Sequence, residues 1–153
     1  GRVYDAGKTA IEAFCLRAGI ELVHDVGPPI AQTPATVAGV PVQVHGILPA
    51  EAVSGLLLRC RVLITSYPAN TAAKSTVIAA GMAHGCAIYN CTESSGPNDG
   101  RSEWQPCGWD GIGWRAAGEA GYVTYHRRRS WDVAAEELFK PPNNVAQAST
   151  ENI

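Results

Sequence analysis

Two short cationic segments stand at or just ahead of the starts of expected helices, and each could bind an anion. The first contains Gly1, Arg2, Gly7 and Lys8, and the second is the run Lys74-Ser75-Thr76. Glycine lets the backbone approach a ligand closely, arginine offers a two-pronged donor, and lysine supplies a point charge. A helix start adds unpaired amides and the positive end of the helix dipole. Both segments therefore predict binding of phosphate groups, with a solvated surface turn as the alternative.

The scarcity of lysine strengthens this hypothesis. The chain has three lysines, and two of them, Lys8 and Lys74, stand at expected helix starts. In an open α/β sheet the carboxyl ends of neighbouring strands face one crevice. We therefore expect Arg2, Lys8 and Lys74 to converge on one diphosphate. The pattern is neither the Walker sequence nor the dinucleotide sequence G-x-G-x-x-G.

Further polar and glycine residues near expected strand ends are candidates for contacts with a nucleoside or a sugar. They are Asp25, Gly27, His45, Gly46, Tyr67 and Asn70. For His24 and His45, a hydrogen-bonded structural role is the main alternative to ligand contact. His84 precedes a glycine at a helix end, where an imidazole can bond the last carbonyls, and we interpret it as structural. No catalytic triad, carboxylate pair or metal cluster can be assembled from the sequence.

The elements that position these residues alternate between strands and helices. This alternation predicts an α/β fold, specifically a Rossmann-like three-layer α/β/α sandwich with a mostly parallel sheet. We expect its first strand to be absent, because the chain opens on what resembles the turn after a strand. The expected elements are a helix at Ala10–Ala18 ended by Gly19, strands at Ile20–Val26 and Val42–His45, a helix headed by Pro49, a strand at Arg61–Thr65, a helix at Ala73–His84 and a strand at Cys86–Asn90.

The last third of the chain has a different character. Residues 92–118 are polar and rich in glycine and tryptophan, and predict a long loop that packs or contacts a ligand. Tyr122–Tyr125 could form a short edge strand. Ser130 is a good N-cap for a last helix over Trp131–Lys140. We expect residues 1–140 to form one domain and residues 141–153 a polar tail.

Composition excludes several classes of protein. The chain has 153 residues, 46% of them hydrophobic and 17% charged, with a formal net charge of −2. The net charge shows no excess of basic residues of the kind that nucleic-acid-binding proteins carry. No apolar run approaches the roughly 20 residues that a membrane-spanning helix needs. The chain opens without the charged start and apolar run of a signal peptide. Its five cysteines lack paired metal-site spacing, and predict free buried thiols in a reducing, cytoplasmic setting rather than a zinc site.

The order of these motifs resembles one family of enzymes. It is similar to the C-terminal, donor-binding half of glycosyltransferases of the GT-B fold, which use nucleotide sugars. The likeness covers roughly Gly1 to Cys91, through the segments GRVYDAGK, LVHDVGPP, VHGILPAEAVSGLLLRC, LITSYP and KSTVIAAGMAHG. In that family an arginine and a lysine after the first strand hold the donor diphosphate. The resemblance assigns these roles to Arg2 and Lys8.

The chain also departs from the family's pattern. Many retaining members carry two glutamates seven residues apart, the second of which bonds the donor ribose. Ala72 and Ala80 occupy those positions here. Neither alanine can bond a hydroxyl through its side chain, so the ribose must be held otherwise or not at all. The hydroxyls and amides of Ser75 and Thr76 offer partial compensation toward the phosphates.

The resemblance implies a donor-binding domain that moves a sugar from a UDP- or GDP-linked donor to an unidentified acceptor. It implies no cofactor and no metal, since no Asp-x-Asp is present. In this family the acceptor site belongs largely to an N-terminal half, so we expect this chain alone to bind a donor without turnover. Two alternatives remain: a non-catalytic interaction module that has lost donor binding, and another sugar-nucleotide enzyme such as an epimerase.

Overall fold

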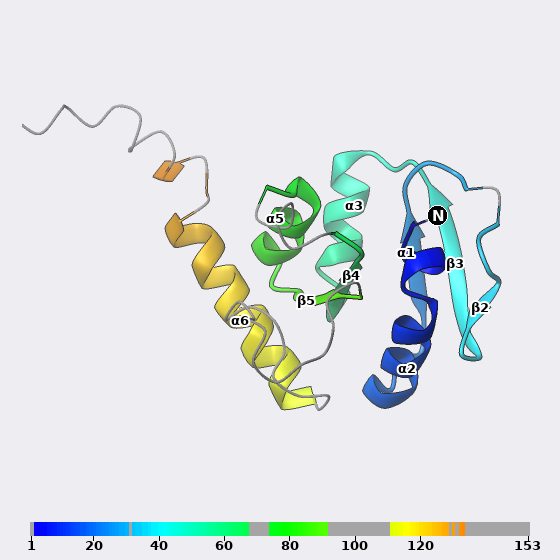
Figure 1. Cartoon of the computed structure of the whole chain (residues 1–153). Helices are drawn as coiled ribbons and strands as arrows, with labels where there is room; N and C mark the ends of the chain where they lie inside the picture. The colour runs from blue at the N-terminus through cyan, green and yellow to red at the C-terminus, as the bar shows by residue number, and fades with distance from the viewer. Residues whose placement is uncertain are drawn as a thin grey trace, which may run out of the picture.

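The computed structural model describes residues 2–30, 32–67, 74–91, 111–128, 130 and 132–133. Two helices and three strands come first, and from β3 onward strands and helices alternate (Figure 1). In chain order they are α1 (Arg2–Ala6), α2 (Lys8–Ala18), β1 (Val23–Val26), β2 (Thr36–Val37), β3 (Val40–Gly46), α3 (Ala50–Leu57), β4 (Val62–Thr65), α5 (Thr76–Ala83), β5 (Ala87–Asn90) and α6 (Gly111–Arg128).

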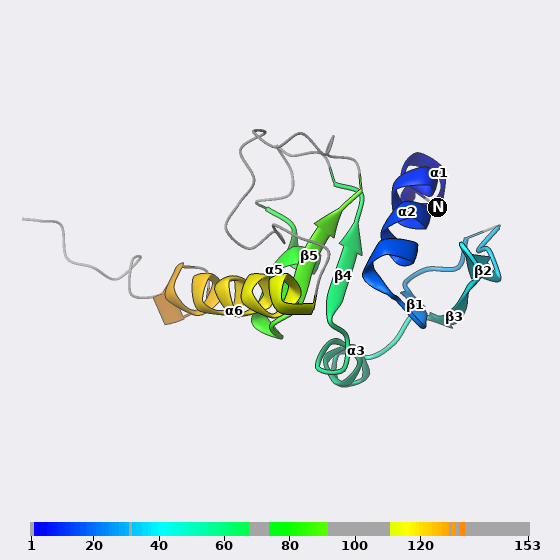
Figure 2. The same ribbon diagram turned by 90° about the horizontal axis from the view of Figure 1, so that it is seen from below.

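The described strands form two small sheets, each built on a parallel pair. β1 pairs in parallel with β3, and β2 adds an antiparallel strand on the far side of β3. β4 pairs in parallel with β5. The strands of the first sheet are seen lengthwise in Figure 1, whereas those of the second are seen lengthwise in Figure 2. The α/β class is therefore confirmed, with two separate sheets among the described strands.

The β4–β5 pair has helices on both faces. Figure 2 shows α5 on one side of this pair and α2 on the other. Successive side chains of β4 point to opposite faces of the pair. Ile64 packs against a buried cluster that includes Phe14 of α2, and Leu63 packs with Ile78 and Met82 of α5. This alternation is the period of two that a strand imposes on its side chains. It explains why the run Val62–Thr65 is almost wholly apolar, as in strands buried on both faces.

The start of the chain differs from the predicted turn. Arg2–Ala6 is a short helix, α1, which precedes α2. The amide of Gly7 donates to the carbonyl of Val3 at 3.1 Å, which closes a helical turn where a loop was expected. α2 begins at Lys8 and ends as predicted at Gly19, whose φ of 59° is left-handed and suits glycine.

The edge strand predicted at Tyr122–Tyr125 is wrong, as is the loop predicted at residues 111–118. Both segments belong to α6. Aromatic and β-branched residues favour strands, but Ala117, Gly118 and Gly121 are buried at helical spacing. These small residues form a smooth face that lets the helix approach β5 closely. Tertiary packing has overridden local propensity here.

The last predicted helix is described only at its start. The Ser130 hydroxyl accepts a hydrogen bond from the amide of Val133 at 3.3 Å, so the predicted cap is confirmed. The rest of Trp131–Lys140, the tail at 141–153, and Trp104, Trp109 and Cys107 of the expected loop lie outside the described residues. No described helix combines the length and the apolar character needed to cross a bilayer.

The cysteines within the described range are free, as predicted. Cys15, Cys86 and Cys91 are buried, and Cys60 is half-buried. Cys86 donates through Sγ to the carbonyl of Leu57 at 3.3 Å. Burial, with a smaller effect of Cys60, raises the pKa of Cys86 from 9.0 to about 11.

This raised pKa predicts a loss of stability in mild alkali. A thiol whose folded pKa lies above its unfolded pKa contributes stability that is complete below the unfolded value and disappears as pH rises through the folded value. By pH 10 the contribution of Cys86 should have fallen by about 1 kcal/mol. Urea unfolding at pH 7 and pH 10 under reducing conditions measures this, and Cys86→Ala should lose less stability over the same interval. An equal loss in both proteins would contradict the prediction.

Candidate functional site

The first turn of α5 combines a cation, a cap and open amides. Ser75 is the N-cap, and its hydroxyl accepts a hydrogen bond from the amide of Ile78 at 3.3 Å. The amides of Thr76 and Val77 precede the first intrahelical bond, so they point out of the helix end. Lys74 stands directly before the cap and is exposed. The structure thus builds this predicted segment into a helix start that is able to receive an anion.

Two polar residues end the neighbouring strands β4 and β5. Thr65 is aligned with Asn90 in the parallel register. Asn90 donates from Nδ2 to the carbonyl of Tyr67 at 2.6 Å. Thr65 is only 3% exposed, and its Oγ1 atom has no hydrogen-bond partner in the described structure. Because a buried hydroxyl without a partner costs about 1–3 kcal/mol, this atom is a candidate for a functional contact.

Sequence reasoning missed Thr65 and Asn90 as members of the site. The signal was present in the runs Val62–Thr65 and Ala87–Asn90, since each is apolar up to a polar last residue. Polar residues at the carboxyl ends of parallel strands are where ligands of open α/β sheets are bound.

The start of α2 lies against the end of β5. A Cβ placed on Gly7 would overlap Cys91 Sγ, so only glycine allows this approach. The amide of Cys91 donates to the carbonyl of Thr65 at 2.8 Å, which places the start of α2 at the carboxyl ends of both β4 and β5. Lys8, the first residue of α2, is exposed. Gly7 provides no side-chain cap for α2.

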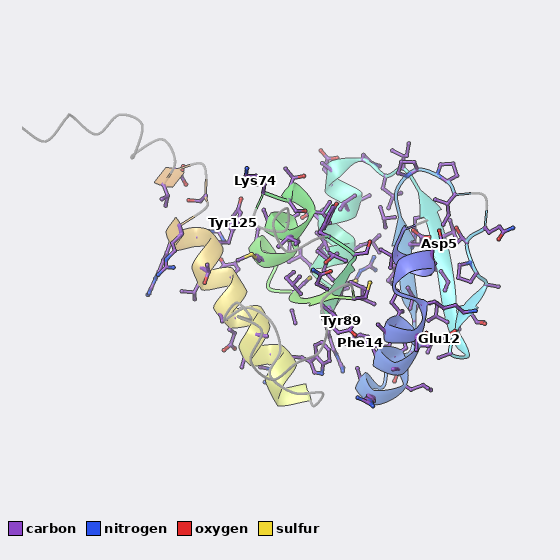
Figure 3. All side chains as sticks on the ribbon, viewed as in Figure 1. Asp5, Glu12, Phe14, Lys74, Tyr89 and Tyr125 are labelled. Carbon is purple, nitrogen blue, oxygen red and sulfur yellow. The ribbon has the colours of Figure 1, made fainter. Side chains whose placement is uncertain are left out.

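The two cationic helix starts flank the β4–β5 pair from opposite sides. In Figure 3, α3 and β4 lie between Lys74 and Asp5 of α1. Figure 2 shows α5 and α1 separated in the same way. Convergence of Lys8 and Lys74 on a single ligand stays a prediction. The backbone of Arg2 lies in α1, while Gly1 and Asn70 lie outside the described residues.

A second group of predicted residues gathers at the carboxyl ends of β1 and β3. The amide of Gly27 donates to the carbonyl of Gly46 at 2.9 Å, and Gly46 has a left-handed φ of 68°. Tyr4 and Asp25 are joined by a side-chain hydrogen bond, and burial together with the Asp25 charge raises the pKa of Tyr4 to about 12. The Asp25 carboxylate therefore ties α1 to β1, which competes with its predicted role in binding a ligand hydroxyl.

The rings of His24, His45 and His84 make hydrogen bonds. His24 Nδ1 lies 2.9 Å from His45 Nε2, and burial, the His45 ring and the Arg59 charge lower the pKa of His24. His84 Nδ1 lies 2.7 Å from the carbonyl of Ala80, which confirms its structural role at the end of α5. Since that carbonyl can only accept, His84 Nε2 accepts the hydroxyl proton of Ser54 at 2.7 Å.

Across the residues that the structure describes, no three metal-ligating side chains come together. Ala80 lies within α5, and Ala72 lies outside the described residues. Comparison of the chain with protein-family models, with curated proteins and with solved structures gives no significant match.

Proposed function

We propose that this chain binds the diphosphate of a nucleotide sugar and is the donor-binding part of a glycosyltransferase. The observation that carries the proposal is the start of α5, where exposed Lys74 and the open amides of Thr76 and Val77 follow the parallel strand β4. A helix start with a lysine beside it suits a phosphate group in both charge and hydrogen bonding.

The strand ends supply further groups for such a ligand. At the end of β4 the Thr65 hydroxyl has no hydrogen-bond partner among the described residues, and Lys8 stands at the start of α2 on the other side of the β4–β5 pair. In a transfer reaction the departing nucleoside diphosphate gains negative charge. Fixed amides and lysines would stabilise that charge better in the transition state than in the ground state.

A Rossmann-like three-layer fold is part of the same proposal. The parallel pairing of β1 with β3 and of β4 with β5 supports it, and so do the helices α3, between β3 and β4, and α5, between β4 and β5. So does the packing of α2 and α5 on opposite faces of the β4–β5 pair. Parallel strands with such helices place their ligands at the carboxyl ends, where the cationic segments stand.

Charge reversal at Lys74 tests this function. Lys74→Glu should weaken UDP or GDP binding by about tenfold or more, because a charge-assisted bond to phosphate is worth about 1.5–3 kcal/mol and the new carboxylate repels it. Isothermal titration with the full chain measures the affinity. Arg115→Glu is the matched control, since Arg115 is exposed on α6. Equal affinities in the two variants would overturn the assignment of Lys74 and favour an interaction module instead.

A further inference from the structure

His24 and His45 form an isolated pair of imidazoles on neighbouring parallel strands. Their facing nitrogens, Nδ1 of His24 and Nε2 of His45, are 2.9 Å apart. Their ring centroids are 5.1 Å apart with an angle of 40° between the planes. Both side chains are half-buried near the carboxyl ends of β1 and β3.

This spacing is close to that of two imidazoles on one metal ion. Nitrogens about 2.0–2.1 Å from an ion are about 2.9–3.4 Å apart when the angle at the ion is about 90–110°. The ring centroids would then be about 4.5–5.2 Å apart. The observed nitrogen and centroid separations both lie within these ranges. A small rotation of each ring would therefore turn both nitrogen lone pairs toward a common ion. The metal would replace the proton that the two nitrogens share.

We propose that His24 and His45 bind a divalent transition-metal ion between their facing nitrogens. Imidazole favours zinc, copper and nickel, whereas magnesium and calcium prefer oxygen ligands. Asp25 follows His24 on the strand and so points to the opposite face, where it bonds Tyr4. No third metal-ligating side chain of the described residues joins the pair. The ion would therefore keep open positions for water or for an external ligand.

The main opposing charge near the pair is Arg59. Its guanidinium acts on His24 electrostatically, and its Nε donates to the carbonyl of Gly55 at 3.1 Å. A cation between the histidines would be repelled by this charge. Arg59→Gln should therefore tighten metal binding severalfold, an effect that a merely structural histidine pair would not produce.

The test uses the full chain with zinc chloride in a non-chelating buffer that contains a phosphine reductant. His24→Gln and His45→Gln should each weaken zinc binding by about tenfold or more, as the loss of a ligand requires. His126→Gln is the matched control, because His126 is exposed on α6, and it should leave the affinity unchanged. Magnesium chloride should produce no binding heat. Unchanged zinc affinity in both pair variants would overturn the proposal.

A measurement on the unmodified protein covers the case in which a variant does not fold. In histidine-labelled protein, zinc should shift the ring resonances of His24 and His45 and leave those of His84 and His126 in place. Shifts at His84 or His126 alone, or no shift at one equivalent of zinc, would show that the pair is not a metal site.

Discussion

Replacing Phe14 by alanine is expected to lower the free energy of unfolding by about 3–5 kcal/mol. Phe14 is fully buried and joins three elements of the structure. Its ring stacks on Tyr89 of β5 with centroids 4.1 Å apart, and meets Trp114 of α6 edge-on at 5.0 Å. Figure 3 shows Phe14 beside Tyr89, where α2 approaches the β4–β5 pair. Truncation removes these contacts and leaves a cavity that rigid neighbouring strands cannot close.

Leu16→Ala is the matched control for this prediction. Leu16 lies two residues further along α2 and is 69% exposed, so its truncation should change stability by less than about 0.5 kcal/mol. Urea unfolding followed by circular dichroism measures both variants. Similar losses for the two would mean that α2 does not pack on the β4–β5 pair through Phe14.

Replacing Gly118 by alanine is expected to destabilise the protein by up to about 3 kcal/mol. Gly118 is buried in α6, and a Cβ there would overlap the carbonyl oxygen of Gly85, a backbone atom that cannot rotate away. The change should push α6 off β5, although alanine is the better helix former by about 1 kcal/mol. Packing and propensity therefore act in opposite directions at this position, and packing is the larger effect.

Gly55→Ala separates these two effects. Gly55 lies inside α3, and a Cβ there would have no atom within 4 Å. This substitution should raise stability by about 0.5–1 kcal/mol through helix propensity alone. Thermal unfolding compares the two glycine variants. A stabilising effect of Gly118→Ala would show that α6 does not pack this closely.

Elements that combine a clear hydrophobic pattern with residues that favour their boundaries could be predicted from the sequence. α2 has an apolar stripe and a glycine at its end, and Val62–Thr65 is a short apolar run bounded by polar residues. α6 could not be predicted in the same way, because beside Trp114 its buried face consists largely of small residues, glycine and alanine. Such residues carry little hydrophobic signal, and the helix depends on the surface of β5 that receives them.

The candidate site was predictable where charge marks a helix start. Lys74 and Ser75 were found because a lysine and a hydroxyl stand at the start of an expected helix that follows a strand. The Thr65 hydroxyl, which has no partner among the described residues, could not be found from the sequence, because its hydrogen bonding depends on residues distant in the sequence. The contacts of Asp25 with Tyr4 and of His24 with His45 could not be predicted for the same reason, because each joins residues of separate elements that only folding brings together.

The most direct test of donor binding is a thermal-shift series on the full chain with UDP, GDP, ADP and TDP, with inorganic phosphate as the control. A ligand that binds the folded state raises the unfolding midpoint, by about 2.7 kcal/mol of stabilisation at a hundredfold excess over Kd. We predict a clear rise with one nucleoside diphosphate, no comparable rise with phosphate, and loss of the rise in Lys74→Glu. No rise with any diphosphate, on a sample that unfolds cooperatively, would contradict the proposal that this chain binds a nucleotide-sugar donor.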